Sequence, residues 1–274
     1  MKQGADDDRG RRHETYLDAL RLPSLAAARR VLPIVFELVE VASVVDIGCG
    51  PGAWLAAARE VGIRRLVGVD GPWAGDWLEG SLLGTGDFKF VSHDLEEPLP
   101  ALGHFDLALA LGVAEYLPEV CATALIPGIC EIAPAAILFS SAIPFQPKNA
   151  ELQQTEKWPS WWAHHFEECG YRPLDAIRPL IWSDPTIAWW YRQGIILYTK
   201  ESKHQELAAR ARLVSPTLDV VHPELFTGIA SWSLEPSYPR REPGLRERLR
   251  IARGIPRALG RSLRRRIHKW KASR

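Results

Sequence analysis

The stretch SVVDIGCGPG at residues 43–52 decides the fold. Its first five residues are mostly apolar and β-branched, which is typical of a buried strand. The glycines that follow allow a tight turn and a close approach of the backbone to a ligand. An alanine-rich helix is expected at Ala53–Val61, so the turn leads directly to a helix N-terminus with free N–H groups. This strand, glycine loop and helix together predict an α/β domain with a cofactor site.

Outward from this loop, apolar strand-like runs alternate with helical segments. Strands are expected at Ser43–Ile47, Arg65–Asp70, Phe88–His93, Phe105–Leu111, Ala135–Ser140, within Tyr171–Trp182 and at Gly194–Lys200. Helices are expected at Tyr16–Glu40 with breaks near Pro23 and Pro33, at Ala53–Val61, from about Ala114, at Trp158–Glu168 and at Thr186–Gln193, with Trp73–Leu83 ambiguous. The alternation predicts a Rossmann-like, doubly wound, mostly parallel seven-stranded sheet with helices on both faces. We expect this domain, with an N-terminal helical cap, at 1–205 and a C-terminal extension at 206–274.

Three carboxylates stand near the ends of the first three expected strands. Asp46 lies two residues before Gly48, where a negative charge suits a cationic amino-acid group and opposes a pyrophosphate. Asp70 could accept both hydroxyls of a ribose, and Asp94 could accept from an adenine amino group. Together they predict a site for a nucleoside joined to a cationic amino acid. The alternatives are that the carboxylates only cap loops and helices, or that the glycine spacing marks a nicotinamide-dependent oxidoreductase.

The glycine loop and the carboxylates resemble those of the class I S-adenosylmethionine-dependent methyltransferases. DIGCGPG resembles their first motif, Asp70 their ribose-binding acid and Asp94 their adenine-side acid. FDLALALGVAEYLP resembles their fourth motif, although Glu115-Tyr116 stands where that motif often has Glu-His. The resemblance covers roughly residues 30–200. It implies S-adenosylmethionine as cofactor and S-adenosylhomocysteine as product. The implied cofactor site consists of Asp46, Gly48, Cys49, Gly50, Gly52, Asp70, Gly71, Asp94, Leu95 and Leu111.

The acceptor side is less defined by the sequence. A hydroxyl acceptor would benefit from a general base, and the candidates are Glu115, Tyr116, His164 and His165. Each could instead be a surface or core residue. The stretch EKWPSWW is similar to a Glu-x-Trp-Pro-Ser-x-Trp stretch of some bacterial methyltransferases found near glycan and natural-product pathways. We therefore expect a small-molecule or saccharide acceptor. No metal-ligand spacing occurs, so we expect no metal, and Trp189, Trp190 and Tyr191 are expected to pack against the sheet.

The charge of the chain is divided unevenly. Residues 240–274 carry 14 Lys and Arg and 2 Glu, a net charge of +12, whereas residues 1–239 have a net charge of −11. Apolar residues recur every three or four positions from Leu245 to Trp270, which indicates a basic amphipathic helical tail. An anionic membrane surface suits such a tail. Nucleic acid is a rival partner that we consider unlikely, and self-docking on the acidic body is a third option.

The remaining features bear on location and on rival functions. The chain has four cysteines without metal-ligand spacing, a polar and charged N-terminus unlike a signal peptide, and no apolar run of 18 residues. These features predict a cytoplasmic protein, with peripheral contact at the inner face of the membrane as an option. Besides the small-molecule methyltransferase, three functions stay open: an RNA methyltransferase, a nicotinamide-dependent oxidoreductase and a non-catalytic Rossmann-like binding protein.

Overall fold

One sheet organises the fold in a computed structural model, which describes residues 3–79, 88–133, 135–146 and 153–234. The strands of the described residues are β1 (Ser43–Ile47), β2 (Arg65–Asp70), β3 (Phe88–Ser92), β4 (Leu107–Leu111), β5 (Ala136–Ser140), β6 (Tyr171–Leu174) and β7 (Ile196–Lys200). The helices are α1 (Gln3–Leu38), α2 (Ala53–Glu60), α3 (Trp73–Glu79), the 3₁₀ turn η1 (Ala114–Tyr116), α4 (Glu119–Ile132), α5 (Pro159–Glu168), α6 (Arg178–Ile181), α7 (Trp189–Gly194), α8 (Glu201–Arg210) and α9 (Pro223–Leu234).

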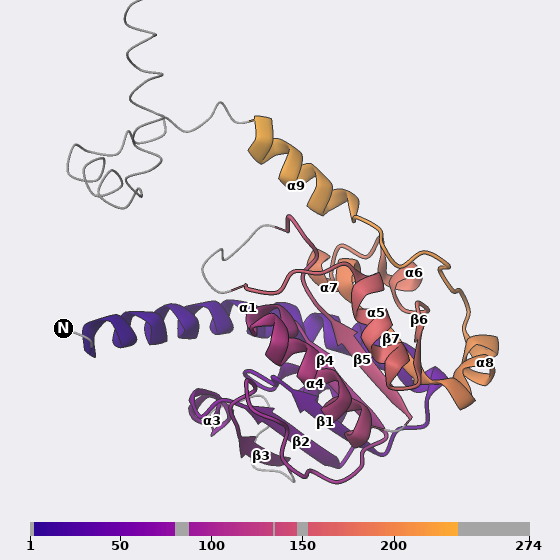
Figure 1. Ribbon diagram of the computed structural model, residues 1–274, viewed down its shortest axis with the longest axis horizontal. Helices are drawn as coiled ribbons and strands as arrows, with labels where there is room; N and C mark the ends of the chain where they lie inside the picture. Colours follow the sequence, from indigo (N-terminus) through magenta and orange to yellow (C-terminus); the bar gives the residue numbers. More distant parts are fainter. Residues whose placement is uncertain (1–2, 80–87, 134, 147–152, 235–274) are drawn as a thin grey trace, which may run out of the picture. The chain divides into compact units, whose positions relative to one another are not determined.

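The strand order is β3-β2-β1-β4-β5-β7-β6 (Figure 1). The pairs β1–β2, β1–β4, β2–β3 and β4–β5 are parallel, whereas β7 is antiparallel to both of its neighbours, β5 and β6. This confirms the predicted seven-stranded, mostly parallel, Rossmann-like sheet. Because β1 and β4 lie next to each other where the strand order reverses, their carboxyl ends border the crevice in which α/β proteins bind ligands.

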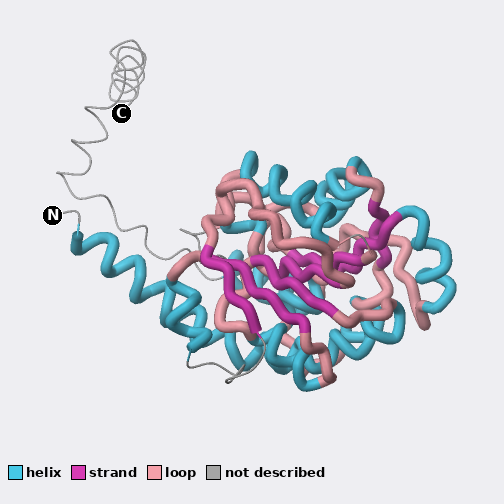
Figure 2. The backbone as a smooth tube through the Cα atoms, turned by 90° about the horizontal axis from the view of Figure 1, so that it is seen from below, coloured by secondary structure: helices cyan, strands magenta, loops and turns pink. Residues whose placement is uncertain are grey.

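Helices cover both faces of the sheet, as Figure 2 shows. Successive strand residues point to opposite faces, so Val44 packs in the core with α1 and α2, while Val45 packs with α4 and α5. All residues of β1, β4 and β5 are buried. This explains why their sequences are continuous apolar runs rather than alternating ones.

The break expected in the first helix is wrong: α1 is continuous through Pro23 and Pro33. A proline inside a helix removes one hydrogen bond and costs roughly 3 kcal/mol. Buried residues at helical spacing, among them Leu25, Ala28 and Leu32, place α1 in the core that also contains α2. Tertiary packing of this apolar face outweighs the local penalty, since packing rather than propensity supplies most helical stability in proteins.

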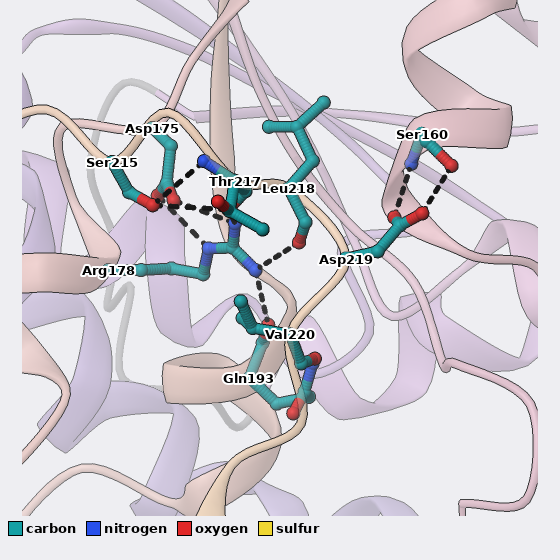
Figure 3. A network of polar contacts seen from close by, with 9 residues as sticks. All are labelled: Ser160, Asp175, Arg178, Gln193, Ser215, Thr217, Leu218, Asp219 and Val220. Atoms are coloured by element: carbon teal, nitrogen blue, oxygen red, sulfur yellow. Dashed lines mark hydrogen bonds and ion pairs between the residues drawn. The ribbon is translucent and has the colours of Figure 1, made fainter.

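The chain after β7 stays attached to the domain through a buried arginine (Figure 3). Arg178 forms a two-bond ion pair with Asp175, at 2.7 and 3.0 Å, and both side chains are 2% exposed. The same guanidinium donates to the carbonyls of Thr217 and Leu218 at 3.2 and 2.9 Å. Gln193 adds a bond from its side-chain amide to the carbonyl of Val220 at 2.8 Å.

These contacts bear on the domain boundary. The compact unit runs from Met1 to Ile229, and a second unit runs from Ala230 to Arg274. We therefore propose a boundary after Ile229 in place of the one expected after residue 205. The basic tail expected at 240–274 lies outside the described residues. Among the described helices, none has both the length and the apolar character needed to cross a membrane.

Candidate active site

The glycine loop after β1 is held against the end of β2. The Gly48 N–H donates to the carbonyl of Val69 at 2.7 Å. Gly48 has a φ of +75°, and a Cβ atom there would lie 2.2 Å from Cγ2 of Val113, in the loop after β4. Gly50 has a φ of +48°. Side chains at these positions would be strained or would collide, so the glycines let the loop reach the adjoining strand ends.

Asp70 fixes the conformation of this loop. Its two carboxylate oxygens accept from the Gly50 N–H at 2.8 Å and from the Gly71 N–H at 2.7 Å. The side chain is buried, and burial raises its pKa to about 6 although the two amides lower it. An ionised carboxylate accepts about four hydrogen bonds, so each oxygen keeps capacity for a further donor, such as a ribose hydroxyl.

Asp46 is a second buried carboxyl beside the first. It is 2% exposed, and burial, together with the negative charge of Asp70, raises its pKa well above the ordinary value. Among the described residues, no basic side chain forms an ion pair with Asp46 or Asp70. A bound cation would favour ionisation of both carboxyls. The arrangement therefore fits a ligand that has hydroxyls at one end and a positive charge at the other.

The other predicted cofactor residues lie around the same strand ends. The Cys49 thiol is buried, and burial raises its pKa, as do Asp46 and Asp70. Asp94 is exposed beyond β3, where its carboxylate accepts from the Glu96 N–H at 3.0 Å.

Leu95, Leu111 and Gly52 complete the predicted set. Leu95 is half-buried, and Leu111 is buried at the end of β4. Gly52 is the N-cap of α2, and its N–H donates to the Cys49 carbonyl at 2.9 Å. All the predicted cofactor residues thus lie at the carboxyl ends of β1, β2 and β4 or on the loops after β1, β2 and β3, and their roles stay predictions.

Glu115 lies in η1, shortly after β4. It is 5% exposed in η1, and burial raises its pKa to about 7. A Cβ atom on Gly112 would lie 3.7 Å from Glu115 Oε1, and the adjoining Val113 contacts the glycine loop. The neighbouring Tyr116 is half-buried, and its carbonyl accepts from the Gln154 side chain at 2.9 Å. The carboxyl of Glu115 therefore lies beside the loop that borders the cofactor residues.

The two histidines lie elsewhere, on α5. His164 has a side chain that is 68% exposed, with Nε2 at 3.6 Å from Glu168. His165 Nδ1 lies 3.3 Å from the same carboxylate, and its ring packs on Trp161 at 4.3 Å. Their partners are on the same helix, and the structure does not bring them together with Glu115. Their predicted role as a base stays untested.

Comparison with known proteins gives the family. The family model described as "Methyltransferase domain" matches residues 19–182. The chain belongs to this methyltransferase family. The match contains the glycine loop, the carboxylates and Glu115, and it confirms the resemblance found in the sequence. No curated protein sequence matches this chain significantly.

Solved structures of several methyltransferases are similar to this chain. An O-methyltransferase family protein from Burkholderia thailandensis aligns with a TM-score of 0.51 and 14% identity, over 68% of this chain and 58% of that one. Human N-acetylserotonin methyltransferase with bound S-adenosylmethionine aligns with a TM-score of 0.49 and 17% identity, over 68% of this chain and 55% of that one. Magnesium protoporphyrin IX methyltransferase from Synechocystis PCC 6803 with bound S-adenosylhomocysteine aligns with a TM-score of 0.44 and 17% identity, over 69% of this chain and 83% of that one. This chain spans little more than half of the first two proteins, and the likeness to the Burkholderia protein, at 14% identity, shows the shared fold alone.

A buried hydroxyl near Asp46 was not revealed by the sequence. Tyr191 on α7 bonds to the Ser24 hydroxyl of α1 at 2.8 Å and accepts from the Trp54 indole of α2 at 3.4 Å. Burial raises the pKa of Tyr191, and the charge of Asp46 raises it further. The sequence led us to expect Tyr191 to pack against the sheet. Tyr191 is buried in the core that also contains α1 and α2. Its hydroxyl connects α7 with both of these helices, close to the predicted cofactor residue Asp46.

Proposed function

We propose that this protein transfers a methyl group from S-adenosylmethionine to an oxygen or nitrogen atom of a small molecule or saccharide. One observation supports the cofactor above all others. Asp46 and Asp70 are two buried carboxyls at the carboxyl ends of adjoining strands, next to a glycine loop, with no ion-pair partner among the described residues. A cofactor with a ribose and two positive charges complements this pair.

The bound cofactor would supply an activated methyl group on a cationic sulfonium. The protein would contribute binding and orientation. Each carboxylate oxygen of Asp70 accepts one backbone N–H, from Gly50 or Gly71, and would accept a second hydrogen bond from a ribose hydroxyl. Asp46 would face the positively charged amino-acid end. A pyrophosphate at Asp46 would meet repulsion, which opposes the nicotinamide alternative.

Calorimetry with S-adenosylhomocysteine and NAD tests the cofactor. The wild type should bind the first and not the second. Asp70→Ala should weaken S-adenosylhomocysteine binding about 30- to 150-fold, since a lost bidentate, charge-assisted contact costs roughly 2–3 kcal/mol. Asp106→Ala is the matched control. Asp106 also accepts two hydrogen bonds, from the Ala42 N–H at 3.0 Å and the Ser43 hydroxyl at 2.7 Å, but at the opposite edge of the sheet. Equal affinities for the wild type and Asp70→Ala would contradict the proposal.

Burial of Trp162 on α5 removes it as a surface on which a saccharide could stack, which favours a small acceptor. Trp162 is 2% exposed and packs on Phe139 at 5.1 Å between ring centroids. Trp161 is half-buried, with the Lys157 ammonium 4.9 Å above its ring. A panel of hydroxyl and amino compounds, with and without sugar rings, assayed for transfer of a labelled methyl group, would identify the acceptor class.

The basic tail at 240–274 supports a second part of the proposal, a peripheral contact with an anionic membrane. Its net charge of +12 opposes the −11 of the preceding residues, so self-docking is the competing hypothesis. Each basic residue near an anionic bilayer contributes on the order of 1 kcal/mol before screening. A membrane contact of this kind would bring the enzyme close to lipid-linked or cell-surface precursors.

A further inference from the structure

We infer that Glu115 and Ser141 together form the site for the acceptor hydroxyl, with Glu115 as the group that takes its proton. This inference rests on the proposed methyl transfer and makes it more specific. It assigns the acceptor atom as the oxygen of an alcohol or phenol.

Two buried polar atoms carry the inference. Glu115 Oε2 and Ser141 Oγ are both buried, and neither has a hydrogen-bond partner among the described residues. Leaving such a group unsatisfied is unfavourable, and each one in a native structure calls for an explanation. The Ser141 hydroxyl lies near enough to lower the pKa of Glu115, although it does not meet the geometry of a hydrogen bond. The Glu115 carboxyl and the Ser141 hydroxyl are thus neighbours, and each includes a buried atom without a hydrogen-bond partner among the described residues.

Their positions are fixed by the ends of two adjoining strands. Ser141 directly follows β5 and Glu115 lies four residues after β4, and the Gly112 N–H donates to the Ser140 carbonyl at 3.0 Å. From the other side, α7 approaches closely at Gly194, where a Cβ atom would lie 3.1 Å from the Ser141 carbonyl. The pair therefore lies at the strand edge that carries the predicted cofactor loops.

The chemistry of the pair selects a hydroxyl. A carboxylate oxygen only accepts, whereas a serine hydroxyl can donate. A ligand that satisfies both must donate to Glu115 Oε2 and accept from Ser141 Oγ. An alcohol or phenol does both with one oxygen atom. An ammonium group has no acceptor and a carboxylate has no donor, so neither satisfies the pair. A neutral amine nitrogen can do both, and the comparison with aniline below separates it from a hydroxyl.

The same pair can remove the proton. Burial, and to a smaller extent the Glu156 carboxylate, raises the pKa of Glu115 to about 7. Hydrogen bonds from the backbone amides of Glu115 and Ala142 lower this pKa but do not offset the rise. A base with a pKa near the working pH is effective in proton transfer. In the transfer step, the acceptor oxygen forms a bond to the methyl carbon while the carbon–sulfur bond breaks. The hydroxyl proton passes to Glu115 Oε2, and the neutral thioether S-adenosylhomocysteine leaves.

Phenol and anisole form a probe pair for this site, because anisole keeps the ring but lacks the hydroxyl donor. With S-adenosylhomocysteine bound to the full chain, ligand-observed NMR should show phenol binding at least tenfold more tightly than anisole. Ser141→Ala should reduce this ratio about two- to tenfold, the effect of one lost hydrogen bond. With S-adenosylmethionine, Glu115→Gln should slow phenol methylation at least about 100-fold. It should also abolish the rise of kcat/KM with pH toward a plateau above about 7.

Glu119→Gln is the matched control, because Glu119 lies four residues away at the start of α4, where its exposed carboxylate pairs with Lys157 at 2.7 Å. It should behave as the wild type. The inference is overturned if the phenol-to-anisole ratio is near one, if aniline or benzoate is methylated in preference to phenol, if phenol is not methylated, or if wild type and Glu115→Gln react at equal rates. Calorimetry separates failure of this inference from failure of the proposed function. The wild type, Ser141→Ala and Glu115→Gln should bind S-adenosylhomocysteine with affinities that agree within about twofold, whether or not the hydroxyl site exists.

Discussion

At the scale of single residues, the buried carboxyl of Glu115 affects the stability of the fold. Its pKa is about 7 in the folded protein and 4.5 in a model peptide. The folded state therefore binds the proton more tightly, and its stabilising contribution is complete below pH 4.5 and is lost as the pH rises through 7. Glu115→Gln removes this loss and should raise the free energy of unfolding near pH 8 by up to about 3 kcal/mol, with little effect near pH 5.

Urea denaturation of the wild type and Glu115→Gln at the two pH values measures this effect. The exposed Glu119→Gln should change stability little at either pH. An equal gain for Glu115→Gln at both pH values would show that packing, and not ionisation, causes it. Asp46 and Asp70 have the same sign of shift, so the wild type without cofactor should itself lose stability over this pH range.

The carboxylates of the candidate site were predictable from the sequence, whereas its buried hydroxyls were not. Asp46 and Asp70 have fixed spacings from a glycine loop, and parallel strand topology then brings them together. Ser24 and Tyr191 are 167 residues apart, so only the folded chain shows their contact. The contacts of His164 and His165 with Glu168 on the same helix were likewise not predicted, and their role as a base stays a prediction.

At the scale of elements, Arg178 of α6 pairs with Asp175 in the preceding loop and donates to two carbonyls of the segment that leads to α9. Removing one member of a buried pair leaves the other charge uncompensated and typically costs about 3–5 kcal/mol. Arg178→Met should lower the free energy of unfolding by about this amount, because it also removes the donors to the carbonyls of Thr217 and Leu218. Chemical denaturation followed by circular dichroism measures the change.

Arg172→Met is the matched control for that prediction. Arg172 pairs with Glu201 at 2.7 Å, but the two side chains are 50% and 58% exposed. An exposed pair contributes about 0–1 kcal/mol, so this variant should be close to the wild type. Similar effects of the two substitutions would mean that the buried pair does not hold the segment.

Most strands could be predicted because each is a short apolar run bounded by polar or glycine-rich sequence. The expected Ala135–Ser140 strand, for example, is β5 within one residue. The first helix could not be predicted correctly from its prolines, since the packing that keeps α1 continuous involves α2 and other distant parts of the chain. The attachment of residues 211–222 was missed for the same reason: Arg178 and Gln193 give no local signal of the carbonyls that they bind.

At the scale of the whole molecule, the charge division predicts a separable role for the tail. Removing residues 240–274 should abolish co-sedimentation with anionic vesicles and leave S-adenosylhomocysteine affinity unchanged, because the predicted cofactor residues all lie before residue 112. Salt should weaken the vesicle binding of the full chain, since exposed charges are screened. Neutral vesicles are the control.

The competing self-docking hypothesis predicts a different result for the same truncation. Exposing the acidic body would lower the melting temperature, and vesicle binding would change little. Full-length protein that stays in the supernatant with anionic vesicles at low salt would contradict the membrane proposal. Nucleic acid that co-purifies with the full chain and is released by salt would instead favour an RNA partner.

The position of β7 also has a consequence for synthesis on the ribosome. Strands β1 to β5 pair only with one another or with β7. Strands β2 and β3 are added in turn on one side of β1, and strands β4 and β5 are added in turn on its other side. Strand β6 emerges before β7 but pairs only with β7 among the described strands. A nascent chain can therefore form the five-stranded part with its glycine loop while β6 still lacks a partner. Helix α7, which carries Tyr191 and Gly194, directly precedes β7 in the chain. The sheet beside it is completed only when β7 leaves the exit tunnel and inserts between β5 and β6.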